Sequence, residues 1–172
     1  PRRRGHERER ARFLVFWSRN WTPKLAPQRS LSNTSSMDEW LYREPSAFGG
    51  KRLFRLGLSA DYGLDEAGVR AAMDRGVNWF LVTSSGKGLE KPLREALAQR
   101  RDDVAVVAFA NIGWFGWGVR RGADRLLRRL DTDYIDVLML GWLGVASAWT
   151  PATERALVEL RKSGKVRAIG VS

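Results

Sequence analysis

The chain has 172 residues, of which 44% are hydrophobic and 28% charged, a composition typical of a globular domain with its own core. It has no cysteine, which excludes disulfides and thiolate metal sites, and its one histidine, His6, lies in a charged N-terminal run, so we expect no histidine metal site or general base elsewhere. No run approaches the roughly 20 apolar residues of a membrane span, so we expect no membrane partner.

Most of the net charge of +11 comes from residues 1–36, where nine Lys and Arg stand against two Glu, a net +7. This segment joins the charge run PRRRGHERERAR to the polar stretch SLSNTSS, and its apolar FLVFW is shorter than a signal-peptide core. We expect residues 1–36 to be disordered, residues 37–50 to lead into the domain, and the location to be cytoplasmic. One hypothesis is that Met37, the first methionine, is the natural start. Nucleic-acid binding is not expected, because no nucleic-acid-binding fold signature lies beside the basic segment.

Strand and helix patterns alternate from Lys51 to Ser172. Five apolar runs predict strands, which are, in chain order, RLFRLGLS (52–59), VNWFLV (77–82), VAVVAFA (104–110), YIDVLML (134–140) and VRAIGVS (166–172). Between these runs, apolar positions at helical spacing predict helices over 65–75, 89–99, 119–130 and 150–164. Asp65 and Thr150, the latter followed by Pro151, are suited to begin the first and last of these helices.

The alternating order predicts parallel strands joined by right-handed crossovers, an α/β fold. The continuous apolar run VAVVAFA is typical of a strand that is buried on both faces. Periodicity alone is compatible both with an open doubly wound sheet and with part of a closed barrel. An open sheet of this kind also has two free edges, which are an aggregation hazard unless something covers them.

Three segments resemble the aldo-keto reductase family. AAMDRGVNWF (71–80) is similar to its first helix and second strand, LRRLDTDYIDVLML (127–140) to the segment entering its fourth strand, and ALVELRKSGKVRAIGVS (156–172) to the segment entering its fifth. The resemblance implies a parallel (β/α)8 barrel of the TIM type, of which residues 51–172 form the N-terminal portion, with about five strands and four helices. It also implies NADP(H) as the cofactor and the reduction of aldehydes and ketones as the activity.

The family's chemistry uses an Asp, a Tyr, a Lys and a His: the Tyr protonates the carbonyl oxygen, the Lys and His tune it, and the Asp holds the Lys. When the family's motifs are laid on this sequence, these four positions fall at Leu81, Gly86, Phe109 and Gly141. None of these residues can move a proton, so we expect no catalytic residue there and no metal site. Ser172 stands where the family has a serine that hydrogen-bonds the nicotinamide, which makes it the candidate cofactor-binding residue.

Other residues could take part in a modified site. Lys87 lies one residue past the expected Tyr position and Tyr62 follows the first strand, so both are alternative proton donors, although a solvated loop lysine and a packed tyrosine are the simpler interpretations. Four tryptophans are expected in loops on the ligand face, where they either plug the mouth of the barrel or form an apolar pocket for a small-molecule ligand: Trp114, Trp117, Trp142 and Trp149.

Three functions therefore stay open. The first is a degenerate family member, a pseudoenzyme that keeps the scaffold for ligand binding. The second is an active NADPH-dependent oxidoreductase that uses unorthodox residues and a C-terminal half beyond Ser172, and the third is a non-functional remnant. Because a complete barrel takes about 250 residues, we expect the chain to be a fragment of a longer product or a half-barrel that needs a partner to close it.

Overall fold

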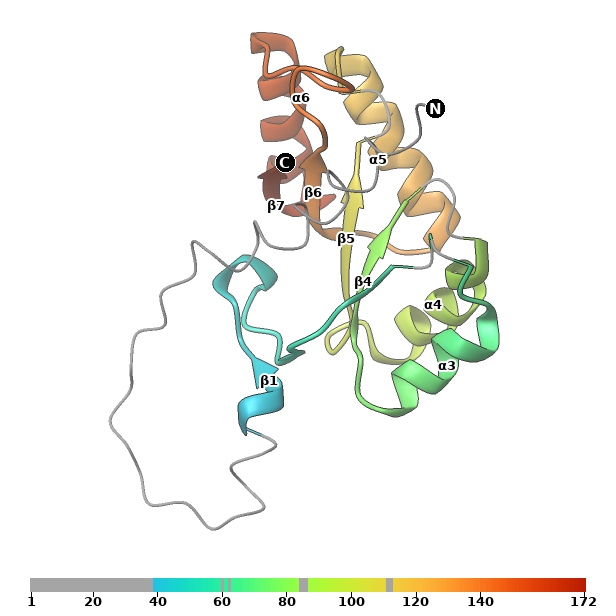
Figure 1. Ribbon diagram of the computed structural model, residues 1–172. Helices are drawn as coiled ribbons and strands as arrows, with labels where there is room; N and C mark the ends of the chain where they lie inside the picture. Colours follow the sequence, from blue (N-terminus) through green and yellow to red (C-terminus); the bar gives the residue numbers. More distant parts are fainter. Residues whose placement is uncertain (1–38, 60, 62, 84–86, 111–112) are drawn as a thin grey trace, which may run out of the picture. The chain divides into compact units, whose positions relative to one another are not determined.

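Figure 1 shows the protein as a computed structural model, which describes residues 39–59, 61, 63–83, 87–110 and 113–172. The disorder expected for residues 1–36 lies outside this part of the chain. Across the described ranges, no helix has both the length and the apolar character needed to cross a membrane.

Five parallel strands form one sheet, and their order in the sheet is their order in the chain. They are β3 (Leu58–Ser59), β4 (Trp79–Val82), β5 (Ala105–Phe109), β6 (Ile135–Leu140) and β7 (Val166–Val171). A doubly wound sheet reverses its strand order at a switch point, and this sheet has no reversal among its described strands. The sequential order is therefore that of a barrel wall, which decides between the two folds that periodicity left open.

Helices connect the strands in the predicted alternation: α3 (Glu66–Asp74), α4 (Lys87–Arg100), α5 (Gly116–Leu130) and α6 (Pro151–Lys162). The side chain of Asp65 accepts a hydrogen bond from the backbone nitrogen of Gly68 at 2.8 Å, and Thr150 forms a capping box with Thr153. The structure starts α5 earlier than the predicted residue 119. The first turn of α5 packs closely against α6 because residue 116 is a glycine. A Cβ at this position would collide with the backbone of Ala152 in α6.

The strand predicted over residues 52–59 is interrupted. Its first part, β2 (Leu53–Phe54), pairs antiparallel with β1 (Tyr42–Arg43), and only its last part, β3, joins the parallel sheet. Residues 37–50, expected to lead into the domain, thus supply β1 and a short 3-10 helix, η1 (Ser46–Phe48). A partner strand of two residues leaves no periodic pattern, so sequence reasoning could not separate the hairpin from the sheet.

Side chains alternate between two apolar clusters, one on each face of the sheet. Fully buried Phe80 and Leu138 belong to the cluster that includes the helices, whereas Val107, Val137 and Met139 belong to the other. Among the described residues, the α-helices contribute side chains only to the first cluster. The four helices therefore cover one face, and the second face is the inner wall of the partial barrel.

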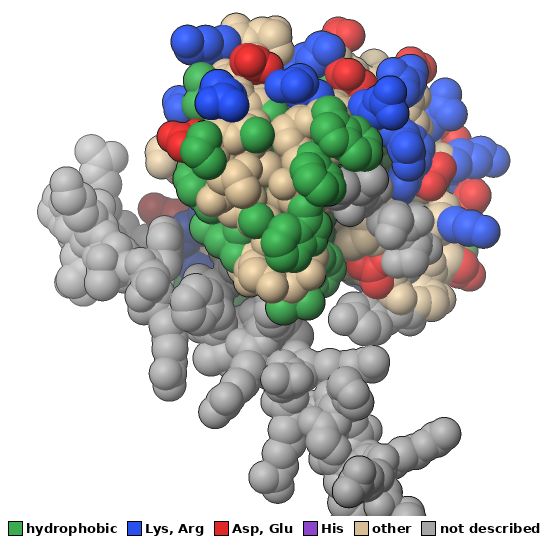
Figure 2. Space-filling view, turned by 90° about the horizontal axis from the view of Figure 1, so that it is seen from above, with side chains coloured by type: hydrophobic (Ala, Val, Ile, Leu, Met, Phe, Trp, Pro, Cys, Tyr) green, Lys and Arg blue, Asp and Glu red, His purple; other side chains and the backbone are tan. Residues whose placement is uncertain are grey.

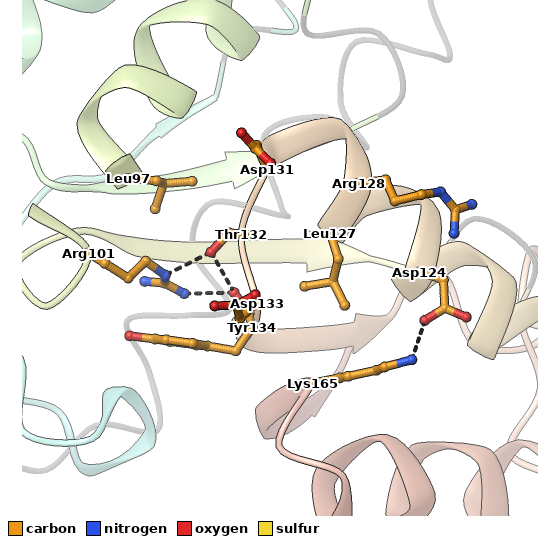
Figure 3. A pocket seen from close by; sticks show the side chains of 10 residues that line it. All are labelled: Leu97, Arg101, Asp124, Leu127, Arg128, Asp131, Thr132, Asp133, Tyr134 and Lys165. Carbon is orange, nitrogen blue, oxygen red and sulfur yellow. Dashed lines mark hydrogen bonds and ion pairs between the residues drawn. The ribbon is translucent and has the colours of Figure 1, made fainter. Parts of the chain in front are cut away.

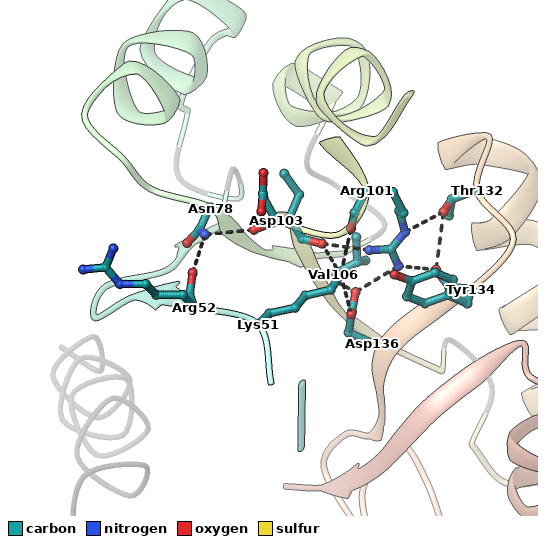
Figure 4. Close-up of polar contacts among 10 residues, drawn as sticks. Lys51, Arg52, Asn78, Arg101, Asp103, Val106, Thr132, Tyr134 and Asp136 are labelled. Carbon is teal, nitrogen blue, oxygen red and sulfur yellow. Dashed lines mark hydrogen bonds and ion pairs between the residues drawn. The ribbon is translucent and has the colours of Figure 1, made fainter. Parts of the chain in front are cut away.

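A buried ion-pair cluster ties the segment before β2 to the amino ends of β5 and β6 (Figure 4). The carboxylate of Asp136, which is fully buried, lies 2.9 Å from Nζ of Lys51 and 2.9 Å from Nη2 of Arg101. It also accepts a hydrogen bond from the backbone nitrogen of Val106 at 2.8 Å. Burial lowers the pKa of Lys51, and the hydrogen bond to Asp136 opposes that shift.

Two further contacts close the same end of the sheet. The ring of Tyr134 lies between two guanidinium groups, with Arg101 at 3.5 Å and Arg167 at 3.7 Å from its centroid. The amide of Asn78 accepts from the backbone nitrogen of Phe54 at 2.8 Å and donates to the carbonyl oxygen of Asp103 at 2.8 Å. The amino ends of the strands are thus held by polar contacts within the protein, a stabilising arrangement, and the carboxyl ends are where a barrel carries its site.

Candidate functional site

Three of the four positions that the family motifs marked lie together at the carboxyl ends of neighbouring strands. Leu81 is in β4, Phe109 ends β5, and Gly141 follows β6. The side chains of Leu81 and Phe109 pack on the same inner-wall cluster and are half-buried. The fourth position, Gly86, lies outside the described residues. The structure thus brings apolar groups together at the place where the family motifs put the proton-transfer groups.

Phe109 occupies the space that a side chain at position 141 would need. A Cβ built on Gly141 would lie 2.6 Å from Cδ1 and 2.9 Å from Cε1 of Phe109, closer than non-bonded carbon atoms approach. The ring of Phe109 also stacks on Trp142, with 5.1 Å between ring centroids and 27° between planes. Phe109 and Gly141 are therefore complementary in shape, and a histidine at position 141 would not fit beside this phenylalanine.

Ser172 follows β7 and contacts the loop after β6. Its backbone nitrogen donates to the carbonyl oxygen of Leu140 at 3.0 Å, and its own carbonyl oxygen accepts from the nitrogen of Leu143 at 3.1 Å. Its hydroxyl lies 3.4 Å from the backbone nitrogen of Trp142, a long hydrogen bond, and the residue is exposed. Ser172 is thus exposed beside the loop that begins at Gly141, and its contact with a cofactor stays a prediction.

The sequence reasoning missed one carboxylate at this end of the sheet. Asp61 follows β3, and its two oxygens accept hydrogen bonds from the hydroxyls of Ser59, at 2.6 Å, and Thr83. The carbonyl oxygen of Thr83 in turn accepts from Nη2 of Arg129 at 2.9 Å. The one sign of Asp61 in the sequence was its position, shortly after the strand predicted over residues 52–59. A carboxylate held by hydroxyl donors can accept hydrogen bonds from a ligand but is not a proton donor in its ionised form.

The two alternative proton donors differ in what the structure shows. Lys87 is the first residue of α4 and is exposed to solvent. Tyr62 lies outside the described residues. The position of Lys87 agrees with the interpretation of a solvated lysine at the edge of the site.

Two loops at this end join into one surface. The loop before α5 and the loop before α6 are linked by a parallel bridge between Gly113 and Ser147, and Ala148 donates to the carbonyl oxygen of Gly113 at 3.0 Å. The buried hydroxyl of Ser147 donates to the carbonyl oxygen of Gly141 at 2.7 Å. These contacts fix the two loops to each other and to the end of β6.

The joined loops display large apolar side chains to solvent. This apolar platform consists of Trp114, Phe115, Trp117, Trp142, Leu143, Val145 and Trp149, all of which are exposed. Figure 2 looks onto this end of the molecule and shows hydrophobic side chains gathered there, with basic side chains beside them. The four tryptophans predicted for the ligand face are all in the platform, although Trp117 lies in the first turn of α5 rather than in a loop.

A hollow of about 640 Å³ lies at the opposite end, near the C-termini of α4 and α5 (Figure 3). Two of its basic side chains already have partners: Nζ of Lys165 donates to the carboxylate of Asp124 at 2.8 Å, and Nε of Arg101 donates to the hydroxyl of Thr132 at 3.0 Å. Because the hollow lies at the amino ends of the strands, it has the character of a structural surface.

A parallel sheet in sequential order, with helices on one face and an accessible carboxyl end, defines part of a (β/α) barrel. The model of the aldo/keto reductase family matches residues 47–172, so the chain belongs to this family. The predicted family and barrel-type fold are thereby confirmed.

Among curated relatives, aldo-keto reductase YhdN of Bacillus subtilis is 32% identical over 120 residues, covering 60% of this chain and 35% of YhdN. Methylglyoxal reductase YeaE of Escherichia coli is 33% identical over 110 residues, covering 62% of this chain and 38% of YeaE. The chain therefore spans between a third and two fifths of these relatives.

Solved structures give the same picture. The holo form of aldo-keto reductase AKR11C1 from Bacillus halodurans aligns with a TM-score of 0.58 at 25% identity, covering 76% of this chain and 49% of that one. An aldo/keto reductase from Klebsiella pneumoniae in complex with NADP and acetate aligns with a TM-score of 0.56 at 26% identity, covering 72% and 47%. Relatives of this fold thus bind NADP.

Proposed function

We propose that this chain is a degenerate member of the aldo/keto reductase family that keeps the barrel scaffold for ligand binding and lacks the family's carbonyl-reduction mechanism. The observation that carries the proposal is the packing of Phe109 against Gly141. Phe109 fills the space of a side chain at position 141, and Leu81 lies on the same wall, so three of the family's four catalytic positions are apolar.

The chemical consequence follows from what the reaction needs. A general acid within hydrogen-bond reach contributes about 10²–10⁴-fold to the rate, and the negative charge that hydride transfer leaves on the carbonyl oxygen also needs donors. Neither Leu81 nor Phe109 nor Gly141 supplies a donor side chain. The same groups, together with Trp142, form an apolar wall that suits a small apolar ligand at the mouth.

NADP(H) is the cofactor that we propose for the mouth, with Ser172 as a contact of this chain. The support is the NADP-bound relative from Klebsiella pneumoniae and the accessible position of Ser172 beside Gly141. An NADPH fluorescence titration of the native-length protein tests this part, with Ser172→Ala as the variant. We expect weaker binding in the variant, and equal affinity would remove Ser172 from the site.

Turnover is the decisive experiment for the loss of mechanism. The native-length protein is incubated with NADPH and a panel of aldehydes that includes methylglyoxal, and NADPH absorbance is followed. We expect no oxidation above the protein-free rate. Measurable turnover would contradict the proposal and favour an oxidoreductase with unorthodox residues. If that turnover were then lost in Lys87→Met, but kept in the control Lys91→Met on the same helix, Lys87 would be identified as the proton donor.

A further inference from the structure

The apolar platform has more exposed apolar surface than a small ligand at the mouth requires. Val145 is 81% exposed, and Phe115 and Trp149 are more than half exposed, and none of the three belongs to the inner-wall cluster that contains Leu81 and Phe109. Contiguous exposed apolar patches of this kind mark interaction sites. The hydrogen bonds between the two loops hold these side chains in place, so the platform is preformed.

Basic residues continue the platform along α5. The exposed side chains of this helix form one stripe, in which Trp117 is followed at intervals of four residues by Arg121 and Arg125, and then by Arg128. The guanidinium of Arg121 lies 5.6 Å from the ring centroid of Trp117. Within the described part of the chain, Arg121 and Arg125 form no ion pair, whereas Arg120 pairs with Glu159 at 2.8 Å.

We propose that the apolar platform and the arginine stripe of α5 together dock onto an anionic lipid surface. The proposal goes beyond the function given above and departs from the expectation of no membrane partner. That expectation was based on the lack of a spanning segment, and docking at the lipid surface needs none. Trp and Phe favour the interface between lipid and water, and basic side chains beside them are attracted to anionic headgroups. Arg121 lies one helical turn, about 6 Å along the helix axis, from Trp117. When the platform enters the interface, the guanidinium of Arg121 is therefore at the depth of the lipid headgroups.

The chemistry of the platform favours lipid over single-stranded nucleic acid. Nucleic acid would need open aromatic faces on which bases can stack. Three of the five platform rings already have a stacking partner: Trp142 stacks on Phe109, and Phe115 and Trp117 stack on each other with centroids 5.9 Å apart. Trp114 and Trp149 are the two platform rings that stand in neither pair. The most exposed apolar residue of the platform is the aliphatic Val145, which offers no stacking face but partitions readily into acyl chains.

Vesicle flotation with the native-length protein tests the proposal. Vesicles of phosphatidylcholine are compared with vesicles that also contain phosphatidylserine, and quenching of tryptophan fluorescence by brominated acyl chains reports insertion. We expect binding and quenching only with phosphatidylserine present. Failure to bind these vesicles would overturn the proposal, as would tighter binding to a single-stranded oligonucleotide than to the vesicles.

Matched variants locate the contact. Trp117→Ser with Val145→Ser should weaken vesicle binding about tenfold or more, whereas Trp40→Ser, an exposed tryptophan outside the platform, should leave it unchanged. The double substitution Arg121→Gln and Arg125→Gln should weaken binding about 25-fold, which is near fivefold for each charge.

The charge control is the pair Arg161→Gln and Lys162→Gln at the far end of α6, which should have little effect. Binding that survives in the platform variants would overturn the proposal, because it would show that another part of the chain, such as the basic residues 1–36, makes the contact. These outcomes do not depend on NADPH binding or turnover.

Discussion

Gly141→Ala is the substitution that tests the packed site most directly. The new methyl group would lie 2.6 and 2.9 Å from two ring carbons of Phe109, and that ring is backed by Trp142 at 5.1 Å. Gly141 does not adopt a positive φ, so alanine is free of backbone strain there and would alone stabilise the protein by about 0.4–1 kcal/mol. Overpacking a well-filled site costs about 1–3 kcal/mol. We therefore expect the free energy of unfolding to fall by about 1–2 kcal/mol.

A second substitution separates this clash from other effects. Phe109→Leu replaces the rigid ring that the new methyl group meets with a smaller, more flexible side chain. Gly141→Ala should therefore lower the free energy of unfolding much less in the Phe109→Leu background. The coupling between the two positions in a double-mutant cycle should be about 1 kcal/mol or more. Both variants and the double variant are compared by urea unfolding, followed by tryptophan fluorescence.

The result that would refute this reasoning is additivity. If Gly141→Ala leaves the unfolding free energy unchanged or raises it, or if its effect is the same in the Phe109→Leu background as beside the native ring, then Phe109 does not fill the space at position 141. A matched control is Gly144→Ala, since nothing lies within 4 Å of a Cβ there. That variant reports only the strain of a residue whose φ is 84°.

Two further predictions concern the polar cluster at the amino ends of the strands. Asp136→Ala leaves Lys51 and Arg101 without their buried partner. It should lower the free energy of unfolding, measured by urea unfolding, by about 3–5 kcal/mol. A loss below about 1 kcal/mol would show that the ion-pair cluster contributes little to stability. The hydroxyl of Tyr134 is buried with no hydrogen-bond partner among the described residues, so Tyr134→Phe should raise the unfolding free energy at pH 7 by about 1 kcal/mol. Desolvation raises the pKa of Tyr134 in the folded state. The stability of the wild-type protein therefore does not change with the ionisation of Tyr134 below the unfolded pKa of about 10, and it falls as pH rises from there through the folded pKa. The advantage of Phe should widen above about pH 10, and a constant difference between pH 7 and pH 11 would contradict this cause.

The amino-acid sequence determined the alternation of elements and the family motifs. Apolar runs such as VAVVAFA predicted strands that are buried, and Asp65 and Thr150 begin helices as their side-chain chemistry predicted. These features are local, because a cap needs only the next turn and periodicity needs only one element. The expectation that the family's catalytic residues are replaced also came from this level, since it depends only on which residue stands at a motif position.

Tertiary structure decided everything that depends on which segments meet. The strand order that separates a barrel wall from a doubly wound sheet is set by pairing between distant segments. The split of residues 52–59 depends on the hairpin with β1, and the collision between position 141 and Phe109 depends on two strands lying side by side. Asp61 gained its place in the site from the hydroxyl of Thr83, 22 residues away. No local pattern carries such information, because contacts between distant segments are fixed only when the chain packs.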